Sequence, residues 1–436
     1  MCRTGNAGVS TTLSDDLSAR RAVQFAPDVY WVGALDPTLR TFDIILKTAN
    51  GTTYNAYLIR GDDGVAIVDT VKLEFADEFF DRIESVARYD EIKVIVLNHL
   101  EPDHSGALPE LMRRAPQAQL FISTRATSML KALLKPKDQP LPYTTVGTGD
   151  CVSIGNRTLR FLHTPFLHWP DTQCTYLEGD GILFSGDVFG CHYCDFRLFN
   201  DLVGDFRFSF DYYYAHIMRP FKQWVIEALA LIEPLKLNMI APTHGPILRD
   251  RPRRYVAHYR ELSMSTLAGR LDDDERSLAI FYMSSYGNTA RMAEAVYEGA
   301  DAIPGVRVSL YDLEGGETDP FVDLIEEADA LAFGSPTING DAVKPVWDLL
   351  SSLTVVSLKG KLGAAFGSYG WSGEAVPMIE DRMRGLKMRV PLQGLRLKLI
   401  PTEEEIVECE EWGRALASEL VGARAAGRVV ELADLG

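Results

Sequence analysis

Residues 97–106 read Leu-Asn-His-Leu-Glu-Pro-Asp-His-Ser-Gly, and the rest of the chain is interpreted from this stretch. Within six consecutive residues lie four potential metal ligands, His99, Glu101, Asp103 and His104. The apolar, β-branched run at 92–97 predicts a buried strand, and the segment after Gly106 predicts a helix. On such a strand-to-helix loop, alternate side chains can turn to two sides, so the first pair could reach one metal ion and the second pair another. The alternative is a polar loop with a capping Asp.

Composition predicts a soluble protein with more than one domain. The chain has 436 residues, of which 46% are hydrophobic and 24% charged, enough to build two or three packed cores. The net charge of −17 is spread along the chain, which argues against nucleic acid as a partner. No apolar run approaches the roughly 20 residues that span a bilayer, and the polar start of the chain has no signal pattern. We therefore expect no membrane association and a cytoplasmic location.

Six cysteines are too few for a disulfide framework in a chain of this length, which fits a reducing compartment. Cys191 and Cys194 form a Cys-x-x-Cys pair. A redox or zinc role would need a thioredoxin-like context or a second such pair. Neither is present, so packing is the favoured reading of this pair and its role stays open.

The order of predicted elements indicates a layered first domain. After a loosely ordered arm at 1–25, a set of short strands is followed by alternating helices and strands and then by more strands. This order predicts two sheets packed face to face with helices outside. The expected strands are 29–32, 42–46, 53–59, 64–68, 92–97, 120–123, 150–154, 158–162, 175–177, 181–185 and 239–241. The expected helical segments are 75–88, 108–114, 127–134 and 210–231.

Three further potential ligands follow the ends of these elements: His168, Asp187 and His244. Each alone is weak evidence, because a single histidine is more often an ordinary surface or core residue. With the first cluster they complete two metal coordination spheres. Asp187 is the candidate for a bridging carboxylate, because seven ligands are otherwise few for two spheres. Mixed imidazole and carboxylate ligands with open positions suit iron.

These motifs resemble those of the metallo-β-lactamase-like fold and, within it, of the flavodiiron proteins. Hydrolases of this fold carry His-x-His-x-Asp-His and bind zinc, whereas Glu101 here replaces the second histidine, as in flavodiiron proteins. His163 competes with His168, but the family's ligand lies in the His-Trp-Pro-Asp motif at 168–171. The resemblance implies one iron held by His99, Glu101 and His168, a second held by Asp103, His104 and His244, and Asp187 shared between them.

A second domain is indicated from residue 276 onward. A strand at 278–282 is followed by Ser-Ser-Tyr-Gly-Asn-Thr and then a helix at 290–303, a pattern whose backbone N–H groups, hydroxyls and helix start can cradle a phosphate. Strands expected at 306–311, 330–333, 363–367 and 395–400 alternate with helices expected at 319–327, 343–353, 375–385 and 403–421. Three loops at strand ends resemble the FMN-binding loops of flavodoxins: Ser284, Ser285, Tyr286, Gly287, Asn288 and Thr289; Ser335, Pro336, Thr337, Ile338, Asn339 and Gly340; and Ser368, Tyr369, Gly370, Trp371, Ser372 and Gly373.

The expected fold class is therefore mixed α/β and α+β. An N-terminal αββα metallo-β-lactamase-like sandwich at 26–261 carries the diiron site. A polar linker at 262–275 leads to a doubly wound, flavodoxin-like parallel-sheet domain at 276–422. The residues at 423–436 are expected to form a C-terminal tail.

The resemblance also implies an activity and partners. Flavodiiron proteins reduce dioxygen to water, nitric oxide to nitrous oxide, or both, at an iron pair supplied with electrons by FMN. No rubredoxin-like pair of Cys-x-x-Cys motifs and no flavin reductase domain follows, so a separate donor is expected, either rubredoxin or a flavin/NADH reductase. A head-to-tail homodimer, possibly paired into a tetramer, would bring FMN of one chain to the iron pair of the other.

Further residues are expected beside the iron pair. Many family members carry a histidine after the Arg-x-Phe of the first hairpin, whereas Asp43 stands here, and this change affects hydrogen bonding and proton supply. Further candidates beside the pocket are Tyr212, Tyr213, Tyr214 and His192. Two rival functions remain: a zinc-dependent hydrolase of the same fold, and a non-catalytic flavin electron carrier or sensor.

Overall fold

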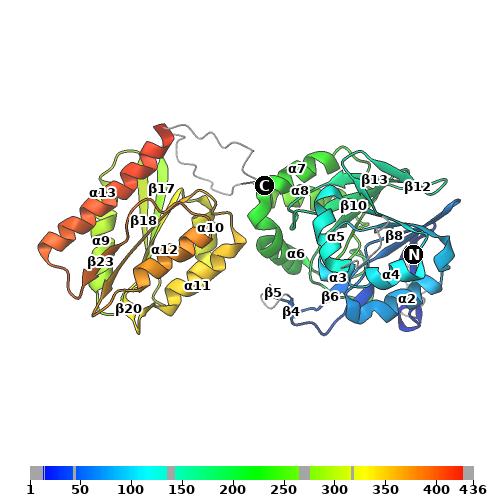
Figure 1. Cartoon of the computed structure of the whole chain (residues 1–436), viewed down its shortest axis with the longest axis horizontal. Coiled ribbons are helices and arrows are strands. Elements are labelled where there is room, and N and C mark those ends of the chain that lie inside the picture. The colour runs from blue at the N-terminus through cyan, green and yellow to red at the C-terminus, as the bar shows by residue number, and fades with distance from the viewer. Residues whose placement is uncertain are drawn as a thin grey trace, which may run out of the picture. The chain divides into compact units, whose positions relative to one another are not determined.

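A computed structural model describes residues 13, 15–42, 46–134, 143–264, 275–315 and 319–425. The chain divides into two compact units, residues 1–264 and 265–436, and each is described separately (Figure 1).

The N-terminal unit contains two packed β-sheets. A sheet of seven strands has the order β1-β2-β7-β8-β9-β10-β11, and a sheet of five has the order β12-β13-β14-β15-β16. The strands of the first are β1 (Val23–Ala26), β2 (Val29–Trp31), β7 (Tyr57–Gly61), β8 (Gly64–Val68), β9 (Ile92–Val96), β10 (Gln119–Ser123) and β11 (Tyr143–Val146). Those of the second are β12 (Cys151–Ser153), β13 (Thr158–His163), β14 (Gln173–Leu177), β15 (Ile182–Gly186) and β16 (Met239–Pro242).

One hydrophobic cluster lies between the two sheets. It contains Ile59 and Val96 of the first sheet together with Phe161 and Phe184 of the second, all fully buried. A second cluster joins the outer faces to the helices. These are α2 (Ala76–Glu84), α4 (Leu108–Arg114), α5 (Thr127–Leu134), α6 (Arg207–Tyr213), α7 (Lys222–Ile232) and α8 (Pro252–Ser263). The expected αββα sandwich is confirmed.

The single strand expected at 53–59 is wrong, because it is interrupted at residues 55 and 56 and the chain forms two strands in different sheets. Residues Thr52–Tyr54 form β6, which pairs with β3 (Ala34–Asp36), and β7 begins only at Tyr57. Asn55 causes the break: its amide Nδ2 donates to the carbonyls of Pro242 and Gly245, 2.8 and 2.9 Å away. The expected strand at 42–46 is likewise replaced by the short strands β4 (Thr41–Phe42) and β5 (Leu46–Lys47), and residues 43–45 lie outside the described part.

The helical segment expected at 210–231 is also interrupted. Helix α6 passes into a π-helical turn at Tyr214–Met218 and a 3₁₀ turn at Arg219–Phe221 before α7 begins. Pro220 explains the interruption, because proline has no backbone N–H and its ring displaces the preceding turn of an α-helix. As a result α6 and α7 are separate helices.

The C-terminal unit is a doubly wound parallel sheet, as expected. Its strand order is β18-β17-β19-β22-β23, and every neighbouring pair is parallel. Helices α9 and α13 cover one face, and α10, α11 and α12 cover the other (Figure 1). The strands are β17 (Arg276–Tyr282), β18 (Val306–Asp312), β19 (Ala330–Gly334), β22 (Leu362–Tyr369) and β23 (Leu395–Lys398). The helices are α9 (Asn288–Asp301), α10 (Asp319–Glu327), α11 (Lys344–Ser352), α12 (Ala375–Gly385) and α13 (Glu403–Ala425).

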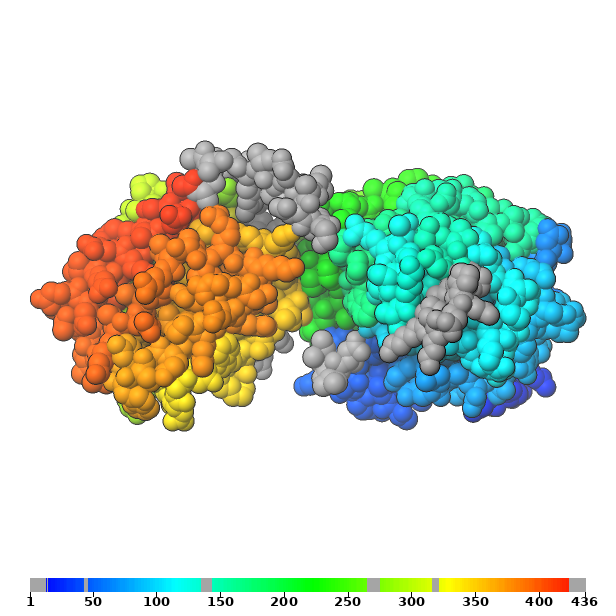
Figure 2. Space-filling view, viewed as in Figure 1, coloured from blue at the N-terminus to red at the C-terminus, as the bar shows by residue number. Residues whose placement is uncertain are grey.

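The last helix forms part of the surface of this unit, where it is coloured red in Figure 2. Its inner side buries Cys409, Leu416 and Leu420 against α9 and the sheet. The strand order places β17 and β19 side by side with their connections running to opposite faces of the sheet. In open parallel sheets, ligands bind beyond the carboxyl ends of the strands at such a position.

Candidate functional site

The ligand loop after β9 is partly helical. Asp103 and His104 lie on a short helix, α3 (Pro102–Ser105), rather than on an open loop. Pro102 favours this because proline fits the first position of a helix, where its missing N–H is not needed. The short helix keeps His104 near His99, with ring centroids 5.4 Å apart, while Asp103 points to a second group of ligands.

One group of side chains meets at Glu101. Its Oε2 atom lies 3.1 Å from Nε2 of His99 and 3.0 Å from Nε2 of His168. His168 reaches this point from the loop between β13 and β14. His163, its competitor, is half-buried on β13, and its Nε2 has no hydrogen-bond partner among the described residues. Only His168 of the two joins the group.

A second group meets at Asp103. Its Oδ1 atom lies 3.2 Å from Nε2 of His104, and its Oδ2 atom lies 3.1 Å from Nε2 of His244. His244 follows β16, the last strand of the N-terminal unit. Both oxygens of Asp103 and both ring nitrogens of His104 are buried without a hydrogen bond in the described structure. Four such atoms together are the arrangement that a cation would satisfy.

Asp187, at the end of β15, lies between the two groups. Its Oδ1 atom is 3.2 Å from Nε2 of His104 and 3.6 Å from Nε2 of His244. Its Oδ2 atom is 3.4 Å from Nε2 of His168 and 3.8 Å from Nε2 of His99. Each oxygen therefore faces one group, which is the geometry of a carboxylate shared between two metal ions. All seven residues predicted from the sequence are brought together. Six of them form two overlapping groups whose donor atoms lie within 4.8 Å of one another, His99, Glu101, His104 and Asp187 in one and Asp103, His104 and His244 in the other, and His168 joins them through Glu101 and Asp187.

The electrostatics of the metal-free protein suit cations. Burial alone would lower the pKa values of His104 and His168, but nearby carboxylates raise both to about 9. Asp103 and then Asp187 act on His104, and Asp187 and then Glu101 act on His168. Burial would raise the pKa of Asp187, but the surrounding histidines hold it well below its usual range. Asp187 is therefore ionised, and His104 and His168 carry protons that metal ions would displace.

His192 lies against this group without joining it. Its Nδ1 atom is 2.9 Å from the hydroxyl of Thr52, and its ring packs 5.0 Å from that of Tyr213 and 4.2 Å from that of Phe42. Burial and the neighbouring His244 hold the pKa of His192 well below its usual range, so this imidazole stays neutral. Its buried Nε2 has no partner among the described residues.

The three consecutive tyrosines point in different directions. Tyr213 is buried against His192, and burial together with Asp187 raises its pKa well above the usual value. Tyr212 stacks on His216 and Phe208 instead. The hydroxyl of Tyr214 lies 2.6 Å from that of Ser263 on α8. Only Tyr213 of the three lies beside the ligand groups.

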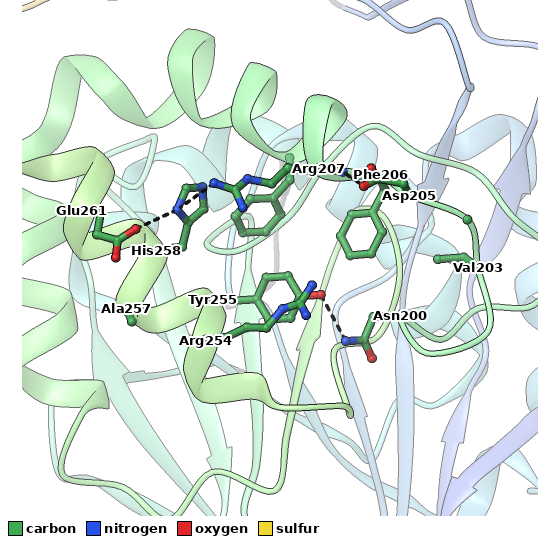
Figure 3. Close-up of a pocket in the computed structure, with 12 residues that line it drawn as sticks. Asn200, Val203, Asp205, Phe206, Arg207, Arg254, Tyr255, Ala257, His258 and Glu261 are labelled. Carbon is green, nitrogen blue, oxygen red and sulfur yellow. Dashed lines mark hydrogen bonds and ion pairs between the residues drawn. The ribbon is translucent and has the colours of Figure 1, made fainter.

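A small cleft opens on the ligands. It has a volume of about 180 Å³, and its lining includes Phe42, Lys72, Glu101 and Asp103. Asp43 lies outside the described residues. A larger cleft of about 620 Å³ lies between the start of α6 and α8, with Phe206, Phe210 and Tyr255 among its lining residues (Figure 3). None of the residues singled out from the sequence lines this larger cleft.

The Cys-x-x-Cys pair carries two free thiols. Burial raises the pKa of Cys191 far above that of an ordinary thiol and raises the pKa of Cys194 to about 12. Thiolates are the reactive form of cysteine, so both thiols are inert at neutral pH. This supports packing for the pair.

In the C-terminal unit, residues 284–289 join β17 to α9. Gly287 adopts a left-handed conformation (φ +79°) directly before the helix, whose first N–H groups have no partner within the helix. Thr289 is buried, and its hydroxyl lies 2.9 Å from that of Ser368 in the third predicted loop. The hydroxyl of Ser284 is buried without a hydrogen-bond partner among the described residues. Hydroxyls and free N–H groups gathered in this way fit a phosphate.

The other two predicted loops follow β19 and β22. The Ser335 hydroxyl accepts a hydrogen bond from the backbone N–H of Val343, 3.1 Å away, which closes the first of them. Trp371 is 76% exposed and Tyr286 is 91% exposed. Exposed aromatic rings suit stacking against a planar ring system. All three loops lie at the carboxyl ends of neighbouring strands.

Known protein families match both units of the chain. The family model described as ODP family beta lactamase matches residues 52–245, and the flavodoxin model matches residues 280–413. The type A flavoprotein of Rhodobacter capsulatus is 61% identical over 95% of this chain and 94% of its own length. The nitric oxide reductase of Moorella thermoacetica is 35% identical over 91% of this chain and 98% of its own length.

Among solved structures, the rubredoxin oxygen:oxidoreductase of Desulfovibrio gigas is similar, with a TM-score of 0.64 and 29% identity over 93% of this chain and 100% of that one. The similarity runs through both units. The chain therefore belongs to the flavodiiron family, also called the type A flavoproteins.

Proposed function

We propose that this oxidoreductase reduces dioxygen to water, nitric oxide to nitrous oxide, or both, at two iron ions, with FMN bound in the C-terminal unit. The observation that carries the proposal is the position of Asp187, whose two oxygens face two separate groups of imidazoles and carboxylates. His99, Glu101 and His168 would hold one ion, and Asp103, His104 and His244 the other. Similar proteins named nitric oxide reductase and rubredoxin oxygen:oxidoreductase support both gases as substrates.

Glu101 favours iron over zinc at this site. A third carboxylate, beside those of Asp103 and Asp187, adds negative charge that stabilises a more highly charged ion. When bound, an iron pair would supply electrons and adjacent coordination positions for gas molecules, and FMN would resupply those electrons one at a time.

The chain's own residues would control water and protons beside the pair. The rings of Phe42, His192 and Tyr213 pack next to His244, and together they would limit the number of water molecules near the ligands. The raised pKa of Tyr213 keeps its phenol protonated at neutral pH, so it can donate a hydrogen bond. Because His192 is neutral, it adds no positive charge that would oppose metal binding.

FMN would be held by the three loops of the C-terminal unit. The hydroxyls of Ser284 and Thr289 with the N-terminus of α9 would bind the phosphate. The exposed rings of Tyr286 and Trp371 would flank the isoalloxazine. The remaining loop, residues 335–340, would contact the edge of that ring system.

Partners and assembly follow from the same proposal. Electrons would come from a separate donor, either a flavin/NADH reductase or rubredoxin, and the name of the Desulfovibrio gigas relative supports rubredoxin. A head-to-tail homodimer, possibly paired into a tetramer, would bring FMN of one chain to the iron pair of the other. In the described part of the chain, helices are either too short or too polar to cross a membrane, and we propose a cytoplasmic location.

Asp187→Ala tests the proposal. The variant loses the shared carboxylate, so it should bind less iron and lose reduction of both gases, while FMN content stays at one per chain. Asp205→Ala, which changes an exposed carboxylate of the same unit, is the control and should behave like the wild type. Full gas reduction by Asp187→Ala would refute the proposal, and zinc rather than iron in the active protein would favour a hydrolase.

A further inference from the structure

Asp171 contacts the ring nitrogen of His99 that points away from the ligand groups. Nδ1 of His99 lies 3.3 Å from both carboxylate oxygens of Asp171. Because an ionised carboxylate can only accept a hydrogen bond, Nδ1 must carry the proton. That leaves Nε2 free to face Glu101 and Asp187.

The carboxylate of Asp171 is itself fixed in place. Its Oδ2 atom accepts a second hydrogen bond, 2.8 Å long, from the backbone N–H of Leu100. The hydroxyl of Ser123 holds its backbone carbonyl at 2.6 Å. Asp171 is only 1% exposed, so water does not screen its charge from His99.

Among the described residues, no carboxylate bonds the outer ring nitrogen of a histidine in the other ligand group. Nδ1 of His244 lies 2.6 Å from the backbone carbonyl of Thr53, a neutral acceptor. Nδ1 of His104 has no hydrogen-bond partner among the described residues. Asp69 is close enough to His104 to interact with it electrostatically, but its carboxylate accepts hydrogen bonds from Asn98 instead. The two groups therefore differ in whether a carboxylate is hydrogen-bonded to the outer nitrogen of a histidine, although each offers two imidazoles and a carboxylate.

We propose that Asp171 is a positioning residue that makes the His99 side the tighter of the two metal positions. A carboxylate behind a metal-bound histidine fixes the ring and raises its basicity, and loss of such partners weakens metal binding by about 10- to 100-fold. The first ion to bind would therefore occupy the position of His99, Glu101 and His168. The inference rests on the proposed metal pair but not on its reaction with a gas.

The test is an anaerobic titration of the metal-stripped, full-length protein with Fe²⁺ against a competing chromophoric chelator. The wild type should bind two ions in two steps of unequal affinity. Its Mössbauer spectrum at one equivalent of Fe²⁺ should show one main iron environment. Asp171→Asn can keep both hydrogen bonds through its amide oxygen but removes the charge. It should weaken the first step by about 10- to 100-fold, leave the second step unchanged and give two iron environments at one equivalent.

Two further variants separate positioning from general structure. Ser123→Ala loosens the same loop without changing the carboxylate, and it should keep the unequal steps even if its melting temperature falls. Asp171→Glu keeps the charge and should also keep unequal steps, which decides the question if Asp171→Asn does not fold. Equal steps in the wild type, an unchanged first step in Asp171→Asn, or equal steps in a folded Asp171→Glu would overturn the inference. Two bound ions with unequal affinities but no gas reduction would overturn the proposed function and leave this inference intact.

Discussion

Nε2 of His168 lies 3.0 Å from Oε2 of Glu101, although the two residues are separated by 67 positions in the sequence. The contact joins the loop after β9 to the loop after β13, one from each sheet of the sandwich. Glu101 therefore connects His99, its neighbour in sequence, to a histidine of the opposite sheet. A metal ion at this point would be held by residues from both sheets and would therefore link them.

Removing the charge of Glu101 should remove one iron. Glu101→Gln has nearly the same shape, but a neutral amide is a poor ligand for iron. We expect iron content to fall from two per chain toward one, and gas reduction to fall by at least about 100-fold, the upper range for a lost partner of a metal site. Metal analysis and gas electrodes measure both quantities.

The matched control for that substitution is Glu110→Gln. Glu110 is a half-buried residue of α4 that pairs with Arg113 and Arg114, and surface pairs of this kind contribute little. This variant should keep two irons and full activity. A Glu101→Gln protein with two irons and wild-type activity would contradict the ligand assignment.

Tyr213 and Tyr212 offer a direct comparison. Tyr213→Phe keeps the ring against His192 but removes the hydroxyl, and loss of a positioned proton donor costs about 10²- to 10⁴-fold in rate. Iron content and melting temperature should not change. Tyr212→Phe, whose ring packs on His216, should retain the wild-type rate. If the two variants show the same rate in gas-consumption assays, Tyr213 has no role in proton supply.

Ser284 should affect FMN binding more than stability. Its hydroxyl is buried without a partner in the described structure, and a hydrogen bond to a charged group contributes about 1.5–3 kcal/mol. Ser284→Ala should therefore bind FMN about 10- to 100-fold more weakly, while the FMN-free protein unfolds at the same or a higher denaturant concentration. Fluorescence titration of FMN measures the first effect. Ser351→Ala, an exposed serine of the same unit, should leave FMN affinity unchanged.

Metal removal should make stability depend on pH. In the metal-free protein, His104 and His168 have pKa values of about 9, above the value of about 6.5 for an unfolded chain. Folding then binds protons, so this contribution is fully present below pH 6.5 and is lost as the pH rises through 9. Denaturant unfolding should show that chelator-treated protein loses stability over this range. Metal-loaded protein should lose less, because metal ions replace those protons, and equal losses in both would contradict this account.

Much of the fold and the ligand set follows from the sequence. Ligands such as Asp187 and His244 stand directly after apolar strands, and strand ends are easy to locate from hydrophobic patterns. The two units differ in the order of their predicted strands and helices and in the residues of their loops, which makes their separate folds predictable. The strand at 53–59 was not predictable in this way, because Asn55 leaves the sheet to bond residues about 190 positions away.

Residues beside the ligands were harder to identify. Successive residues of a helix point about 100° apart, so a run of three tyrosines gives no indication that Tyr213 faces the site. The contact between Thr52 and His192 joins positions 140 apart, and a single sequence contains no signal for it. Asp171 lies in the same short motif as His168, and that proximity was the available clue.

The most direct test is gas consumption by the anaerobically reduced, iron-loaded protein, followed in parallel with dioxygen and nitric oxide electrodes under one artificial donor. We predict that the protein consumes at least one gas rapidly and that the Asp187→Ala variant does not. A protein that holds two irons and one FMN per chain but consumes neither gas would contradict the account and support an electron carrier or sensor.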